Sequence, residues 1–367
     1  MVRRDYLALK IPAGTVDLCI DMADKSMTQK VKELAASTGF ARVGITSAGP
    51  VGRFERYRKW LDRRWCGRMD YVRRNLDVRA DSRLILQGAR SVICLAVGYA
   101  PRGAEPAGAF VARYARGRDY HRVVKSRAGG LMEQFKRCWP GFCGRAFVDS
   151  GPLVERSLAA SAGLGWIGKN GCLIAPGLGS YVVLGEIVCN LPLEADGPIQ
   201  NGCHNCRRCV DACPGGALDG EGLIDARRCV SYLTIEHRGV VEVGHWPAIG
   251  QCVFGCDACQ QVCPFNNDAP PGDAELTTPV GPGSFHLADI LTWSQSDWDL
   301  ATRGSARRRV KWEGWIRNAA ISAGNQAEAL GPNERTRLGR MLEALIRRTD
   351  LPEELMAAVK LNLGRFS

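Results

Sequence analysis

The sequence predicts an α/β fold in which an N-terminal α/β domain precedes a small cysteine-rich unit and a short helical C-terminal unit. Segments with the apolar periodicity of helices and of strands alternate from residue 26 to residue 195. Half of the 16 cysteines then fall in two tight clusters between Cys203 and Cys263. Three amphipathic segments follow beyond residue 311. These three observations together predict a globular protein with more than one unit.

The N-terminal elements are expected in a fixed order. Residues 1–25 show no period and predict a loose extension. Ser26 and Gln29 have the spacing of a capping box, so a first helix is expected to begin there. The elements expected after it are strands over 40–46 and 91–98, a helix over 120–137, a strand over 146–148, a helix from Pro152 to about Ala162 and a strand over 181–188. Residues 26–195 therefore form one α/β domain.

Two changes in composition divide the rest of the chain. A linker with Pro, Gly and Asn covers 191–202, and residues 196–270 form a small unit that we expect to depend on metal. Four prolines between Asp268 and Gly283 indicate a second linker. Amphipathic helices are expected over 312–323, 333–347 and 352–363, within a helical unit that spans 284–367.

Charge and hydropathy limit the partners and the compartment. The formal net charge is +11, and arginines concentrate between Arg53 and Arg90 and between Arg303 and Arg317. Two basic stretches favour an extended polyanion, although a solvated basic surface is the alternative. No apolar run approaches the 18 or so residues of a membrane span, so no membrane partner is expected. Arg3-Arg4 is followed by acidic residues instead of an apolar export segment, which favours the cytoplasm.

The cysteine spacing predicts two [4Fe-4S] clusters. Residues 203–214 form a complete C-x2-C-x2-C-x3-C-P run, in which three thiolates face one cubane and the fourth reaches another. A shorter C-x2-C-x3-C-P run ends at Pro264, and Cys229 supplies its missing ligand. Zinc would need closed sets of four, which C-x2-C pairs alone would allow. The expected ligand sets are Cys203, Cys206, Cys209 and Cys263 for cluster one, and Cys213, Cys229, Cys256 and Cys259 for cluster two. Cys252 has no place in this scheme.

Two short motifs admit a functional and a structural interpretation. Gly163, Gly165 and Gly168 match the G-x-G-x-x-G dinucleotide fingerprint, but a helix precedes them where the fingerprint needs a strand. We expect these glycines to let the backbone approach something bulky. Asp119-Tyr-His121 is similar to the motif by which some corrinoid enzymes present a histidine to cobalt, but its glycine is absent. A plain helix start is the favoured interpretation.

Asp149 is a candidate general acid. It ends an apolar strand, and apolar surroundings raise the pKa of a carboxyl so that it can donate a proton. The alternative is a helix cap for the helix expected at Pro152. The residues alone favour neither the general acid nor the helix cap.

Taken together, these residues resemble the epoxyqueuosine reductase family, the iron-sulfur and cobalamin enzymes that complete queuosine in tRNA. The resemblance covers about residues 26–325. The segments that carry it, besides the cysteine runs, are Asn75 to Asp81, Ala112 to His121, Val148 to Pro152, Ala162 to Asn170, Leu184 to Glu186, Cys229 to Glu236 and Val253 to Asp257.

The resemblance implies an α/β corrinoid-binding domain, a bacterial-ferredoxin-like double-cluster domain and a HEAT-like C-terminal unit. It implies that cobalt is not ligated by histidine, that Asp149 protonates the departing epoxide oxygen, and that electrons reach the cobalamin through the two clusters. The corrinoid contacts that it implies are Arg79, Ala112, Asp149, Leu173 and Leu184. The implied partners are tRNA and an external one-electron donor of the flavodoxin or ferredoxin type, and we expect a monomer.

Two departures from the family accompany the resemblance. Cys252 stands where members usually carry Arg, and the HEAT-like part is short. The rival functions are a corrinoid reductive dehalogenase and a ferredoxin-like electron carrier. A dehalogenase should show an export signal, and a carrier would not need the large α/β domain. The prediction is an oxidoreductase that reduces epoxyqueuosine in tRNA.

Overall fold

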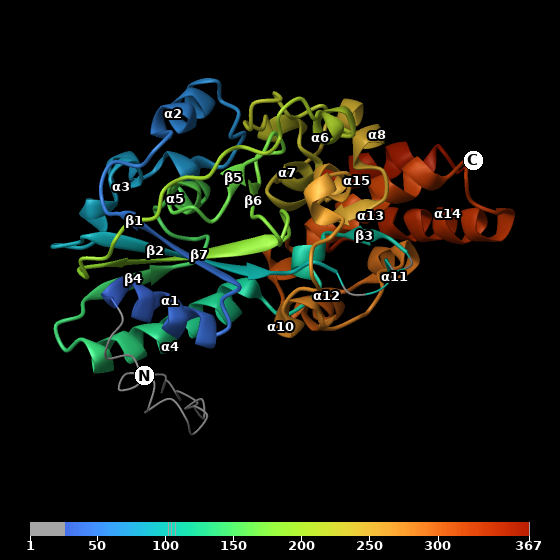
Figure 1. The fold of residues 1–367 in the computed structure, drawn as a ribbon. Coiled ribbons are helices and arrows are strands. Elements are labelled where there is room, and N and C mark those ends of the chain that lie inside the picture. The colour runs from blue at the N-terminus through green and yellow to red at the C-terminus, as the bar shows by residue number, and fades with distance from the viewer. Residues whose placement is uncertain (1–25, 102, 104, 107, 367) are drawn as a thin grey trace.

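The computed structural model describes residues 26–101, 103, 105–106 and 108–366 (Figure 1). The extension predicted for residues 1–25 lies outside the described residues. In the part that the structure describes, no helix is long and apolar enough to cross a membrane.

A four-stranded sheet is the centre of the N-terminal domain. Its order is β1 (Arg42–Ser47), β2 (Ser91–Gly98), β7 (Val182–Cys189) and β4 (Gly144–Phe147), and all three pairings are antiparallel. The α/β fold class is confirmed. Seven of the eight β2 residues are buried because helices cover both faces of the sheet.

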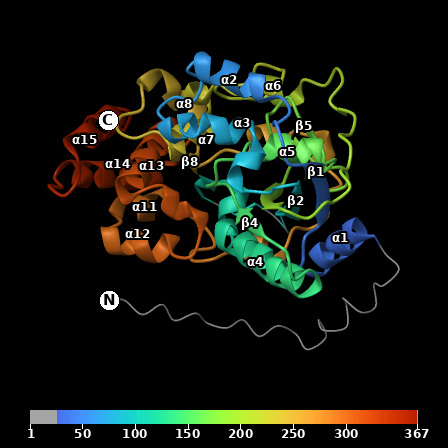
Figure 2. The same ribbon diagram turned by 90° about the vertical axis from the view of Figure 1, so that its left-hand side faces the viewer.

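The two faces of the sheet carry different helices. α1 (Met27–Ser37) and α4 (Tyr120–Cys138) pack on one face, where Leu34, Leu131 and Ile187 share a core (Figures 1 and 2). The Ser26 capping box is confirmed. α5 (Glu155–Ser161) packs on the other face, and α2 (Phe54–Asp62) and α3 (Leu76–Ala80) lie on the same side.

The helix expected from Pro152 begins three residues later than predicted. The residue before α5 is Val154, which makes no side-chain cap. Residues 149–153 form bends instead of a first helical turn. The helix-cap interpretation of Asp149 is therefore wrong, and its side chain is available for other contacts.

The cysteine-rich segment consists of short elements that join its neighbours. Parallel pairing of β3 (Phe110–Val111) with β8 (Cys252–Phe254) links it to the N-terminal domain, and a hairpin of β5 (Trp166–Ile167) and β6 (Leu173–Ile174) lies before it in the chain. Its helices are α6 (Arg208–Asp211), α7 (Val230–Ile235), α8 (Trp246–Ile249) and α9 (Ala258–Gln261), and α10 (Ala274–Thr277) follows.

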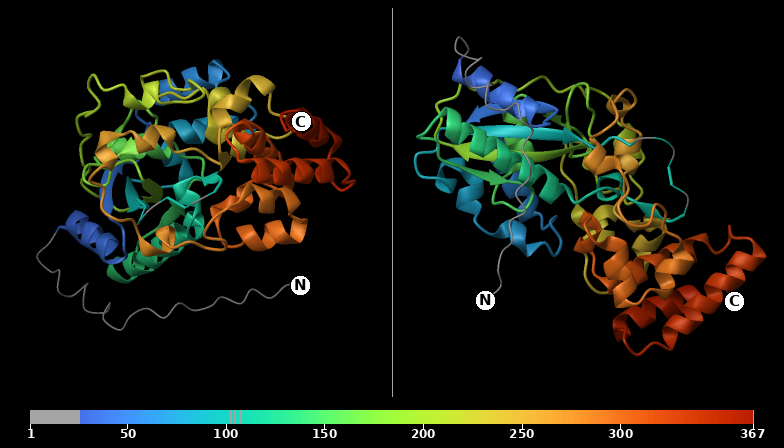
Figure 3. Two further views of the ribbon diagram at one scale, coloured as in Figure 1. Left: turned by 90° about the vertical axis from the view of Figure 1, so that its right-hand side faces the viewer. Right: turned by 90° about the horizontal axis from the view of Figure 1, so that it is seen from below.

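The C-terminal unit is helical, as predicted, and lies at one end of the molecule (Figure 3). α13 (Trp312–Gln326), α14 (Pro332–Ile346) and α15 (Glu353–Leu363) match the three expected helices. α11 (Leu287–Thr292) and α12 (Gln295–Thr302) were not predicted. One apolar core joins these helices to Val253 and Phe254 of β8. The boundaries at 195, 270 and 284 stay predictions, because packing across them is continuous.

Candidate functional site

Asp149 adopts a backbone conformation that is uncommon for an aspartate. Its φ is +56°, in the left-handed region, so neighbouring groups must hold it there. The residue lies two positions after the end of β4, the edge strand of the sheet. Its side chain is 58% exposed, so a bound molecule can reach it.

The first residues of α4 converge on the Asp149 carboxylate. The Tyr120 hydroxyl donates to Asp149 Oδ2 at 2.8 Å, and His121 Nε2 lies 3.1 Å from the same oxygen. The other ring nitrogen of His121 lies 2.7 Å from Asp119 Oδ1. The Asp119-Tyr-His121 segment is thus more than a helix start, although Asp119 also caps α4 through the His121 amide. The favoured helix-start interpretation of this motif is confirmed, and the contacts of Tyr120 and His121 with Asp149 come in addition to it.

Hydrogen bonding, more than burial, sets the charges of this cluster. Burial acts to raise the pKa of Asp149, but the hydrogen bonds from His121 and Tyr120 outweigh it, and the pKa is lowered. Burial acts to lower the pKa of His121, but its bonds to Asp119 and Asp149 raise that pKa to about 9. The raised Asp149 pKa that the sequence suggested is therefore wrong. At neutral pH the proton is on His121, one hydrogen bond from Asp149.

Residues from all three units meet beside Asp149. Arg309 pairs with both carboxylate oxygens of Glu236, at 2.6 and 2.7 Å, and its guanidinium lies 5.5 Å from the ring centre of Tyr71. The Arg309 charge also contributes to the lowered Asp149 pKa. Sequence reasoning missed Tyr71 and Glu236 as site residues, since only the tertiary fold brings them to Arg309.

The four cysteines assigned to cluster one lie together. Burial and the nearby thiols of Cys203, Cys263 and Cys206 raise the pKa of Cys209 to about 11. All four thiols are free. The Trp166 indole N–H lies 3.5 Å from the sulfur of Cys203. This donor set fits a cubane, which takes four thiolates.

The four cysteines assigned to cluster two form a second group. Burial raises the pKa of Cys229 to about 11, with smaller contributions from Cys256 and Cys213. Cys259 interacts with Cys229 and Cys256. The chain brings each set together as the crossed scheme requires, and ligation itself stays a prediction. Cys252, which has no place in the scheme, lies beside Cys256.

The residues implied as corrinoid contacts lie mainly on the α5 side of the sheet. Leu173 and Leu184 belong to one buried cluster with Leu153, and Arg79 donates to the Leu153 carbonyl at 3.2 Å. Ala112 lies apart, where its amide donates to Phe254 of β8. Both ring nitrogens of His121 are engaged by carboxylates. Because both ring nitrogens of His121 are occupied, this arrangement fits a corrinoid whose cobalt has no histidine ligand.

The glycine-rich segment packs against its own hairpin. A Cβ on Gly165 would lie 2.1 Å from the Ile174 carbonyl oxygen, and one on Gly163 would lie 2.7 Å from that of Gly197. The bulky neighbour expected from the sequence is therefore the chain itself. α5 precedes the segment and a loop follows it, so it lacks the strand and helix of a dinucleotide fingerprint.

The second basic stretch divides into buried and exposed side chains. Arg307 is 1% exposed and donates to Ser305 and to the Val280 carbonyl, and Arg317 is 5% exposed and donates to three carbonyls. These two hold the core together and cannot face a polyanion. Arg308 and Lys311 are exposed.

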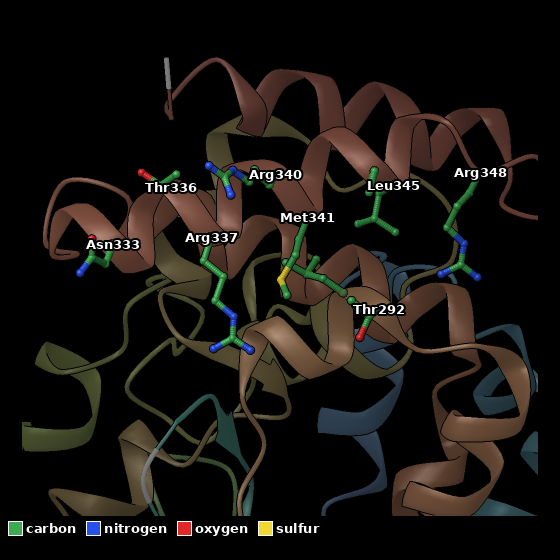
Figure 4. Close-up of a pocket in the computed structure, with 10 residues that line it drawn as sticks. Thr292, Asn333, Thr336, Arg337, Arg340, Met341, Leu345 and Arg348 are labelled. Carbon is green, nitrogen blue, oxygen red and sulfur yellow. The ribbon is translucent and has the colours of Figure 1, made fainter.

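A cavity of about 720 Å³ lies between α11 and α14 (Figure 4), and neither Asp149 nor a cysteine lines it. Arg337, Arg340 and Arg348 line it together with Met341 and Leu345. It extends the basic surface of the C-terminal unit. It contains none of the predicted site residues.

Two family models match the chain. The model described as "4Fe-4S double cluster binding domain" covers residues 202–266. The model described as "Epoxyqueuosine reductase QueG, DUF1730" covers residues 79–150, which hold Asp149, His121 and Asp119. The cysteine-rich segment is therefore a double [4Fe-4S] cluster domain.

Curated relatives cover almost the same length. Epoxyqueuosine reductase of Pseudomonas aeruginosa is 37% identical over 340 residues, which is 90% of this chain and 91% of the relative. The Escherichia coli enzyme is 36% identical over 307 residues, 82% of this chain and 81% of the relative. This chain belongs to the epoxyqueuosine reductase family.

Solved structures agree with this membership. Epoxyqueuosine reductase from Streptococcus thermophilus superposes with a TM-score of 0.76 at 26% identity, covering 93% of this chain and all of that one. An epoxyqueuosine reductase crystallised with an epoxyqueuosine-modified tRNA-Tyr stem loop gives a TM-score of 0.75 at 26% identity, covering 92% of this chain and 98% of that one. The family resemblance inferred from the sequence is confirmed.

Proposed function

We propose that this protein reduces the epoxide of epoxyqueuosine in tRNA to the alkene of queuosine. The observation that carries the proposal is the Asp149 carboxylate, bonded to His121 and Tyr120 within the segment that matches the epoxyqueuosine reductase model. Conversion of an epoxide to an alkene and water consumes two electrons and two protons. The residues of this chain must deliver both.

The proton supply follows from the contacts of Asp149. Asp149 is ionised at neutral pH, so it must receive a proton before it can give one to a departing oxygen that reaches its exposed carboxyl. His121 is protonated at neutral pH and lies 3.1 Å from that carboxylate, so it can supply this proton. Tyr120 and Asp119 orient the two groups. The cluster therefore stores one proton, and the second passes through Asp149 after His121 has taken another proton from solvent.

The electron supply is assigned to the cofactors. A bound cobalamin would supply a strongly reducing, nucleophilic cobalt, and the residues that we assign to hold it are Arg79, Ala112, Asp149, Leu173 and Leu184. Cys203, Cys206, Cys209 and Cys263 would hold cluster one, and Cys213, Cys229, Cys256 and Cys259 cluster two. We further propose a cytoplasmic monomer and a flavodoxin- or ferredoxin-type external donor.

The tRNA surface is assigned to the exposed arginines. The +11 net charge and the exposed members of the two basic stretches, such as Arg58 and Arg308, suit phosphate contacts. The two basic stretches belong to different units of the protein. These units meet beside Asp149, where Arg309 contacts Tyr71.

The proposal is tested with anaerobically reconstituted protein, reduced cobalamin and epoxyqueuosine-containing tRNA. Digestion of the tRNA and mass spectrometry of its nucleosides should show queuosine replacing epoxyqueuosine. Reactions without cobalamin or without reductant are the controls. Unchanged epoxyqueuosine with fully loaded, reduced protein would reject the proposed activity.

A further inference from the structure

Glu186 is a carboxyl group in the middle of the sheet. It lies on β7, opposite Cys94 of β2 and Phe147 of β4, and it is 0% exposed. Neither of its carboxyl oxygens accepts a hydrogen bond from an N–H or hydroxyl group of the described residues. A buried carboxylate without donors is unstable, so Glu186 keeps its proton. Burial and the Glu155 charge raise its pKa well above the usual range.

The polar group that Glu186 meets is the carboxyl of Glu155. Glu155 is the charged group that acts most strongly on Glu186, and its helix α5 packs against β7. A direct contact between the two carboxyls would require a shared proton, because two carboxylates offer only acceptors. Glu155 is the first residue of α5 and comes from a segment far from β7 in the chain. The fold therefore brings the carboxyls of Glu155 and Glu186 close together, next to the Asp149 backbone.

Glu155 also holds the backbone of Asp149. The Asp149 amide N–H donates to Glu155 Oε1. This contact is available because Asp149 is in the left-handed region, with φ +56°. The same conformation presents the carboxylate to Tyr120 and His121. Without the hydrogen bond to Glu155, Asp149 would no longer be held in its strained backbone conformation.

We propose that Glu155 and Glu186 form a latch, in which Glu186 holds Glu155 through a shared proton and Glu155 holds Asp149 in its working conformation. Both are positioning residues. The inference rests on the proposed function, in which Asp149 is the proton donor. Nothing in that chemistry uses either glutamate directly.

The latch depends on pH through the groups around it. The charged or titratable groups that face the pair are Asp149, Arg156, Tyr120 and Cys94. Burial and the Asp149 charge raise the pKa of Glu155 to about 7. Above this pH Glu155 is a stronger acceptor for the Asp149 amide. When Glu186 also ionises at higher pH, two buried anions repel each other and the latch opens.

Hydrogen exchange at the Asp149 amide tests the latch without requiring turnover. In the holoenzyme, Glu155→Ala should lower the protection factor of this amide by about tenfold or more, because the variant removes a hydrogen bond to a charged group. Single-turnover reduction of epoxyqueuosine tRNA should slow while tRNA affinity stays unchanged. Glu133→Ala, which removes an exposed glutamate of α4, is the matched control.

Glu186→Gln separates positioning from general stability. Its amide donates to Glu155 at every pH, so protection at Asp149 should persist at alkaline pH, where the wild type loses it. Unchanged protection in Glu155→Ala, or an alkaline loss in Glu186→Gln equal to that of the wild type, would overturn the latch. A normal turnover rate in Glu155→Ala despite reduced protection would overturn its role in positioning. If no variant, including the wild type, reduces the epoxide, the exchange data still decide the latch while the proposed function fails.

Discussion

The Nε2 atom of His121 lies 3.1 Å from Oδ2 of Asp149, and this contact joins the start of α4 to the end of β4. It places a positively charged imidazole on the carboxylate that we assign as the acid. Neither residue reveals this contact by its position in the sequence.

The first prediction is a pH-dependent contribution of His121 to stability. Its pKa is raised from 6.5 to about 9 in the folded protein. The contribution is therefore fully present below pH 6.5 and is lost as pH rises to about 9. His121→Gln should remove this change between the two pH values, as measured by urea unfolding. An identical pH profile for the variant and the wild type would contradict the charge assignment.

The second prediction concerns the crossed cluster ligands. Cys263 is the last cysteine of the second motif but lies with Cys203, Cys206 and Cys209. Cys263→Ser should damage the cluster of the first motif and leave the other intact. Iron analysis should fall from about eight towards four per chain, with one electron paramagnetic resonance signal remaining. Selective loss of the cluster bound by Cys256 and Cys259 would show that the ligands are not crossed.

The third prediction separates two adjacent arginines. Arg307 is buried and bonded to core carbonyls, so Arg307→Ala should destabilise the protein by about 2 kcal/mol or more. Arg308 pairs with Asp299 at the surface, so Arg308→Ala should cost less than about 1 kcal/mol. Urea unfolding measures both changes.

The exposed side chains of this basic stretch test the tRNA surface. Arg308→Ala combined with Lys311→Ala should weaken tRNA binding and lower the salt slope of log K by roughly one for each phosphate that the variant no longer binds. Cluster and cobalamin content should stay normal. Equal affinity and salt slope in this double variant and the wild type would remove this stretch from the tRNA surface.

The sequence predicted the structural features that are determined by residues close together in the chain. The Ser26 cap, the strands around Ser91 and Val182 and the cysteine spacing follow local rules, and the structure has these elements. The charge of Asp149 depends on His121, which is distant in sequence, and apolar flanks suggested the opposite pKa shift. The burial of Arg307 and the Glu155–Glu186 pair likewise depend on packing between segments that are distant in the chain. No pattern within one segment encodes them.

Asp149→Asn tests the central claim most directly. Asn keeps the shape of the side chain but has no proton to release. The variant should fold, bind both clusters and cobalamin and accept electrons, yet its single-turnover reduction of epoxyqueuosine tRNA should be roughly a hundredfold slower or more. The measurement is queuosine formation over time by anaerobically reduced holoenzyme. Near-native rates in Asp149→Asn would contradict the assignment of Asp149 as the acid.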